Sequence, residues 1–177
     1  MGDSWSLAFT LRHLGDLTRL LGDYPKARRL LEESLDLFQT AGDMDGVARD
    51  LCDLSCVARA RGDYGEAERL LGDVVTLIHR NSGWASLAGT YRESFSELYG
   101  VLAVAKGSFV RGARLLGAAD RHGSWIQYFP SYRADHSAAL AAAQQALGED
   151  AFDRAWAEGQ AMSLEQAVEY SLDEAEA

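Results

Sequence analysis

Side chains that could carry chemistry are few, and they are scattered along the chain. Histidines occur at four separated positions, His13, His79, His122 and His136. Cys52 and Cys56 are the only cysteines, and their four-residue spacing in a helical pattern suits buried thiols better than a disulfide. None of these residues has a metal-ligand spacing. Because the sequence also has no Gly-x-Ser-x-Gly elbow and no Gly-x-x-x-x-Gly-Lys-Ser/Thr loop, we expect no enzyme activity, no metal and no cofactor.

The acidic net charge of the chain argues against some classes of binding partner. The chain has 27 Asp and Glu against 17 Lys and Arg, a formal net charge of -10. Phosphate binding relies on clustered basic side chains, so we expect neither direct nucleic-acid binding nor binding to anionic membranes. No apolar run approaches the roughly 20 residues of a membrane helix, and the first residues lack the features of a signal peptide. We therefore expect a cytoplasmic protein.

A ten-residue motif recurs along the chain. Residues 22–31 read GDYPKARRLL, residues 62–71 read GDYGEAERLL, and residues 107–116 give a degraded third copy, GSFVRGARLL. A period of this kind indicates a solenoid of stacked units. In the first two copies the glycine suits a left-handed helix end, while Asp23 and Asp63 suit the N-cap of the following helix.

Apolar residues at three-to-four spacing predict helices on both sides of these corners, and the composition favours an all-α chain. The stripe before the first corner, which we expect to be buried, is Leu7, Leu11, Leu14, Leu17 and Leu21. We expect one domain over residues 1–177, with antiparallel hairpin repeats at about 4–40, 45–80 and 84–122 and a C-terminal helical cap at about 132–175. The chain begins inside a helical pattern with no polar capping repeat, so we expect it to be excised from a larger protein.

The corner residues resemble the tetratricopeptide repeat (TPR), which implies hairpins stacked into a right-handed superhelix. The residues that carry this resemblance are Leu14, Gly15, Gly22, Asp23, Tyr24, Ala27 and Leu31. Further stretches are similar to the C-terminal tail of bacterial signal-transduction (STAND) ATPases and LuxR-type regulators, namely 113–120, 146–152, 155–159 and 162–168. In that family, nucleotide-binding and often DNA-binding domains precede repeats that sense an inducer or a partner. The resemblance implies a sensor or interaction module.

In TPR-like stacks the first helix of each hairpin, which we call the leading helix, lines the concave face. The residues next to the predicted buried stripe on these helices are therefore the candidate groove. Its residues are Phe9, Arg12, Asp16 and Arg19 in the first repeat, Arg49, Cys52, Cys56 and Arg59 in the second, and Ser94, Glu97, Val101 and Val104 in the third. The four arginines would suit a carboxylate or an acidic peptide. Alternatively, they pair with neighbouring acids and only keep the groove soluble.

An aromatic segment is the second candidate site. Its residues are Trp125, Tyr128, Phe129 and Tyr132. They would contact a partner or cover a ligand, or else they bury the apolar surface of the cap. The sequence thus predicts a non-catalytic protein- or peptide-interaction module, the sensor arm of a bacterial transcriptional or signalling regulator. The alternative is a small-molecule inducer sensor that uses the groove, and an oligomer is possible with either function.

Overall fold

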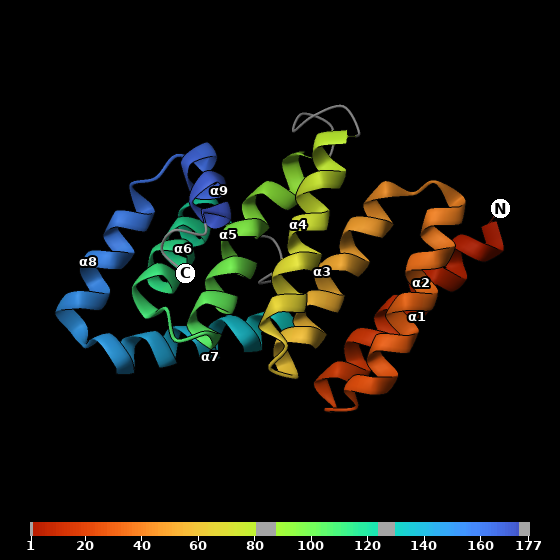
Figure 1. The fold of residues 1–177 in the computed structure, drawn as a ribbon, viewed down its shortest axis with the longest axis horizontal. Helices are drawn as coiled ribbons and strands as arrows, with labels where there is room; N and C mark the ends of the chain where they lie inside the picture. The colour runs from red at the N-terminus through yellow and green to blue at the C-terminus, as the bar shows by residue number, and fades with distance from the viewer. Residues whose placement is uncertain (1, 81–87, 124–129, 174–177) are drawn as a thin grey trace. The chain divides into compact units, whose positions relative to one another are not determined.

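The residues described by the computed structural model, 2–80, 88–123 and 130–173, form α-helices joined by short corners. The helices are α1 (Gly2–Leu20), α2 (Tyr24–Ala41), α3 (Met44–Ala60), α4 (Tyr64–Arg80), α5 (Ala88–Ala105), α6 (Phe109–His122), α7 (Pro130–Leu147), α8 (Glu149–Gln160) and α9 (Leu164–Leu172) (Figure 1). The prediction of an all-α fold is confirmed.

The chain divides into two compact units, residues 1–83 and 84–177. In the first unit α1 pairs with α2, α3 pairs with α4, and α2 lies against α3, so the second hairpin stacks on the first (Figure 1). In the second unit α5 pairs with α6, and α7, α8 and α9 pack on this hairpin. The TPR-like hairpins and the helical cap are confirmed, whereas a single domain with a right-handed superhelical path stays a prediction.

The corners have the predicted local chemistry. Gly22 and Gly62 have φ of +83° and +79°, a left-handed conformation that glycine adopts without strain. The next residue caps the following helix, because Asp23 Oδ1 accepts from the Lys26 amide at 3.1 Å and Asp63 Oδ1 accepts from the Glu66 amide at 3.1 Å. Hydrogen bonds between residues at most about five apart in sequence therefore form the corner of each hairpin in the first unit.

The buried face of α1 differs from the prediction. Only Leu11 of the predicted stripe is buried, while Leu7, Leu14, Leu17 and Leu21 have exposed fractions of 49%, 45%, 57% and 86%. The face that packs on α2 includes Ala8 and Gly15, and a Cβ added to Gly15 would lie only 2.8 Å from Leu31 Cγ. Leucines there would hold the two helices apart.

In the second unit, α6 and α8 cross at two glycines. A Cβ added to Gly117 would lie 2.5 Å from the carbonyl oxygen of Trp156, and one added to Gly159 would meet the carbonyl oxygen of Arg114. Side chains close the edge of this crossing, since Arg114 Nε lies 2.6 Å from Glu158 Oε2. The stretches that resemble a regulator tail thus pack against each other, and they need glycine to do so.

The remaining helices of the cap begin as the sequence indicates. Ser163 and Gln166 form a reciprocal capping box at the start of α9, with bonds of 2.8 and 3.2 Å. A buried Arg111 ties α6 to the end of α9, because its Nη2 donates to the Tyr170 carbonyl at 2.8 Å. Helix α7 begins at Pro130, two residues earlier than expected, since proline is well tolerated in a first turn.

We expect Gly159→Ala to lower the free energy of unfolding by about 1–3 kcal/mol, because the new methyl group must separate α6 from α8. Urea titration followed by circular dichroism measures this change. The matched control is Gly72→Ala in α4, where nothing lies within 4 Å of the added Cβ. Since alanine favours a helix over glycine, the control should gain about 0.5–1 kcal/mol. Equal effects of the two substitutions would contradict the close helix crossing.

Candidate functional site

Helix α1 contributes four residues of the predicted groove. Phe9 is exposed, and the Arg12 guanidinium carbon lies 5.3 Å from the centroid of its ring, a cation–π distance. Arg12 itself is buried, as is Arg19, whose Nη2 lies 3.2 Å from Asp16 Oδ1. For Arg19 the structure therefore shows the pairing with a neighbouring acid that we gave as the alternative to partner binding.

Helix α3 contributes the next four residues. Arg49 and Arg59 are half-buried. Arg59 occupies the position in the second repeat that Arg19 occupies in the first, 40 residues before it. Cys52 and Cys56 are buried and form no disulfide, as expected. Burial raises the pKa of the Cys52 thiol well above its ordinary value, so this group stays neutral and unreactive.

Helix α5 contributes the last four residues, and all of them are buried. Val101 and Val104 belong to the core cluster of the second unit, which also holds residues of α6, α7 and α8. Ser94 is 2% exposed. Glu97, also 2% exposed, lies 3.3 Å from His136 Nδ1 of α7. The cap therefore covers this part of the predicted groove, and its role in binding stays a prediction.

Positive charge gathers around His13 in the first unit. Burial is the largest cause that lowers the pKa of His13. The nearby charges of Arg12 and Arg49 lower this pKa further, whereas the Asp16 carboxylate raises it. The structure thus brings arginines from α1 and α3 to one place. Two guanidinium groups thus act on the His13 imidazole, and the Asp16 carboxylate opposes them.

A buried carboxyl group, Asp50 on α3, escaped the sequence reasoning. It is 0% exposed, and neither of its oxygens has a hydrogen-bond partner within the described part of the chain. The nearby Ser34 hydroxyl donates instead to the Ala8 carbonyl at 2.8 Å. Burial raises the pKa of Asp50 to about 8. A signal was present, because Asp50 lies between Val47 and Leu54 on the same apolar stripe of α3.

A hollow of about 300 Å³ lies between α2, α3 and α4 in the first unit. Apolar residues of α3 form much of its floor, namely Leu51, Leu54, Val57 and Ala58. A double contact spans it, since Arg28 Nη1 and Nη2 donate to the two carboxylate oxygens of Glu66 at 3.0 and 2.8 Å. The hollow therefore has an apolar floor and a rim of paired charges.

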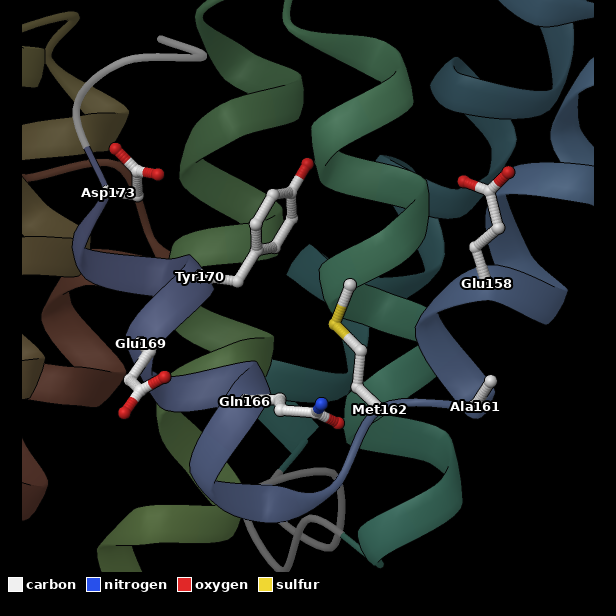
Figure 2. A pocket seen from close by; sticks show the side chains of 7 residues that line it. All are labelled: Glu158, Ala161, Met162, Gln166, Glu169, Tyr170 and Asp173. Atoms are coloured by element: carbon white, nitrogen blue, oxygen red, sulfur yellow. The ribbon is translucent and has the colours of Figure 1, made fainter.

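A second hollow, of about 510 Å³, lies at the end of the cap (Figure 2). Its acidic residues are Glu158 of α8, Glu169 of α9 and Asp173 just after α9, and Met162 and Tyr170 add apolar surface. It is open to solvent, and Glu158 is already engaged by Arg114. The predicted aromatic patch lies mostly outside the described residues, which include only Tyr132, half-buried on α7.

Comparison with known proteins supports the repeat assignment for the first unit. Residues 6–78 match the tetratricopeptide repeat family. This match covers both hairpins of the first unit, α1 to α4. The hairpin packing and the corner bonds of these four helices agree with it.

Two relatives are named "Putative HTH-type transcriptional regulator", one from Mycobacterium bovis and one from Mycobacterium tuberculosis H37Rv. Each is 42% identical to this chain over 77 residues, which is 42% of this chain and 9% of the relative. The matched segment is therefore a small part of a much longer regulator. No solved structure matches the chain.

Within the described residues, no group of three or more His, Cys, Asp and Glu side chains is arranged to hold a metal ion. None of the described helices combines the length and the apolarity needed to cross a lipid bilayer.

The pH dependence of stability tests the state of Asp50. The folded protein keeps this carboxyl protonated up to pH about 8, whereas the unfolded chain releases the proton near pH 4. Stability should therefore fall as the pH rises from about 4 to about 8, and Asp50→Asn should remove most of this fall. Urea unfolding at pH 5 and pH 8 measures it. As a control, Asp36→Asn on the exposed side of α2 should leave the pH slope unchanged. Parallel slopes for wild type and Asp50→Asn would contradict a protonated Asp50.

Proposed function

We propose that the first unit is a non-catalytic protein-interaction module that binds an acidic peptide segment along its leading helices, α1 and α3. The observation that carries this proposal is the convergence of Arg12 and Arg49 around His13 on a surface built from repeats of the TPR type. Repeats of this type commonly serve as recognition surfaces rather than as reaction sites.

The chemistry of the arginines supports a carboxylate ligand. A guanidinium group presents planar paired donors that match a carboxylate, and it stays charged when partly buried. Arg49 and Arg59 are half-buried, so each keeps some contact with solvent, although Nη2 of Arg59 is buried. The exposed ring of Phe9 adds an apolar contact beside Arg12. An acidic segment with one apolar side chain would fit this combination.

The net charge of -10 does not prevent such binding. At physiological ionic strength charges are screened over about 8 Å, so distant acidic residues weaken the attraction only slightly. Contacts at hydrogen-bond distance are screened far less. The local arrangement of charge therefore decides which peptide binds.

In the cell we propose that this module is the sensor arm of a bacterial transcriptional regulator of the LuxR or STAND type. The similarity to much longer proteins named as HTH-type regulators supports this role. The acidic composition supports a division of work in which another part of the regulator contacts DNA. The acidic segment would then belong to a partner protein or to another domain of the same regulator.

A small-molecule inducer is the second candidate ligand. The hollow between α2, α3 and α4 favours it, because about 300 Å³ is at the lower limit of typical small-ligand sites. Its rim of paired charges would bind a polar metabolite rather than an apolar one.

Peptide binding can be tested by a thermal-shift screen of short peptides that contain clusters of Glu and Asp, each compared with its Gln and Asn counterpart. We expect stabilisation by the acidic peptides only. Arg49→Ala/Arg59→Ala should weaken this binding at least about tenfold, since a charged hydrogen bond contributes about 1.5–3 kcal/mol. The dissociation constants come from fluorescence polarisation.

The matched control is Lys26→Ala/Arg29→Ala, which also removes two positive charges, from exposed positions on the trailing helix α2. It should leave the affinity unchanged. Binding that survives in the Arg49→Ala/Arg59→Ala protein would overturn the assignment to the leading helices. Stabilisation by metabolites, and by no peptide, would favour the small-molecule candidate instead.

A further inference from the structure

The hollow between α2, α3 and α4 has an apolar floor to which all three helices contribute. The floor consists of Leu35, Leu51, Leu54, Val57, Ala58 and Leu70. Leu35 and Leu51 are only half-buried, so the floor presents apolar surface that the chain itself does not fully cover. A ligand with an apolar body would remove this surface from water.

The volume of the hollow sets the size of that body. An apolar cavity of roughly 150 Å³ accommodates one benzene molecule. At about 300 Å³, the hollow has room for one such ring together with a short arm. Because the hollow is only partly enclosed, the arm can extend from the floor to the charged rim.

Five charged side chains form this rim, and we call them the rim network: Arg28, Glu32, Glu66, Arg69 and Asp73. Arg28 contacts both Glu32 and Glu66, and Arg69 Nη1 donates to Asp73 Oδ2 at 2.7 Å. Arg69 Nη2 lies 4.0 Å from Glu66 Oε1, which links the two groups of contacts. Three carboxylates against two guanidinium groups leave the rim network with a charge of -1.

The rim network has more capacity to accept hydrogen bonds than to donate them. All three nitrogens of the Arg28 guanidinium already donate to carboxylates, Nε to Glu32 and the other two to Glu66. An ionised carboxylate has about four acceptor sites, and the side chains of Glu32 and Asp73 are each 49% exposed. An anionic ligand would therefore have to displace a carboxylate from Arg28, whereas a cation can bind beside the existing contacts.

We propose that this hollow binds a small organic cation, in which a primary ammonium group is joined by a short arm to one apolar ring. The ring lies on the floor, and the ammonium group donates to a carboxylate of the rim network, which brings their combined charge to zero. This inference rests on the small-molecule candidate given above and names its chemical class. The residues that line the hollow do not include Arg12, Arg49 or Arg59, so the site is separate from the proposed peptide site.

A ligand in the hollow contacts both hairpins of the first unit. Helix α2 belongs to the first hairpin, and α3 and α4 form the second. Within the hollow the two hairpins are already joined by the double contact between Arg28 and Glu66. A bound cation adds contacts across the same junction, so it should stabilise the stacked hairpins and raise the melting temperature.

Three probes with the same ring and different charge test the chemical class, namely 2-phenylethylammonium, 2-phenylethanol and 3-phenylpropanoate. Thermal shift and isothermal titration calorimetry on the full chain measure their binding. We expect the ammonium ion to bind more tightly than the alcohol, and the carboxylate to bind least. No binding of the ammonium ion at millimolar concentration would overturn the proposal. Preference for the alcohol or the carboxylate would also overturn it, but would leave the small-molecule candidate standing.

Charge substitutions at the rim test the role of the rim network. Glu32→Gln/Asp73→Asn changes its charge from -1 to +1 and keeps Glu66 on Arg28. The affinity for 2-phenylethylammonium should fall about two- to thirtyfold, because exposed charge contacts each contribute modestly. The matched control is Glu33→Gln/Asp36→Asn, which removes the same charges from exposed positions of α2 outside the hollow. Equal affinities of the two variants would contradict binding at the rim.

Methyl NMR spectra test the place of binding. The ring of bound 2-phenylethylammonium should shift the methyl signals of Leu51, Leu54 and Val57, which line the hollow. Met162 lies in the acidic hollow of the cap, so its methyl signal reports the rival site for a cation. Shifts at Met162 without shifts at the floor would overturn the assignment.

A final variant separates this inference from the proposed peptide site. Arg49→Ala/Arg59→Ala should bind 2-phenylethylammonium as wild type does, because neither arginine lines the hollow. Loss of peptide binding and loss of cation binding are therefore distinct results. An equal loss of both in this variant would contradict two separate sites.

Discussion

The close contact between a small residue on the leading helix and a leucine on the trailing helix sets the spacing of these hairpins. Gly15 faces Leu31 and Gly100 faces Leu116, and an added Cβ would lie 2.8 and 2.9 Å from the leucine Cγ. Because the two leucines are 0% exposed, neither can move aside. The two helices of each of these hairpins therefore approach closely at this point.

This contact explains why the sequence predicted the helices better than their faces. Corners, caps and helix lengths depend on neighbours in sequence, so Gly22, Asp23 and Ser163 could be interpreted without the structure. The orientation of α1 depends on which of its two apolar sides fits α2. Leucine spacing suggested the wrong side, because tight helix packing here selects small residues such as Ala8 and Gly15 rather than the most apolar ones.

The candidate groove shows the same limit of sequence reasoning. Its residues lie on α1, α3 and α5, and in the first unit the charges of Arg12 and Arg49 both act on His13, while the binding role of the groove stays a prediction. On α5 the same register is covered by the cap, and Glu97 is buried against His136. Burial by α7 depends on contacts between residues about 40 apart, and no local pattern encodes them. Asp50 was missed for a similar reason, since an acidic residue is normally assumed to face solvent.

The leading helix is buried to a different extent in the two units. In the second unit the leading helix α5 lies among α6, α7 and α9, so its side chains serve the core. In the first unit α1 packs on α2 with one side, and its Leu7, Leu14 and Leu17 are exposed, although the equivalent face of α3 is buried. Exposed leucines contribute little to the stability of a single chain, because they remain in contact with water after folding.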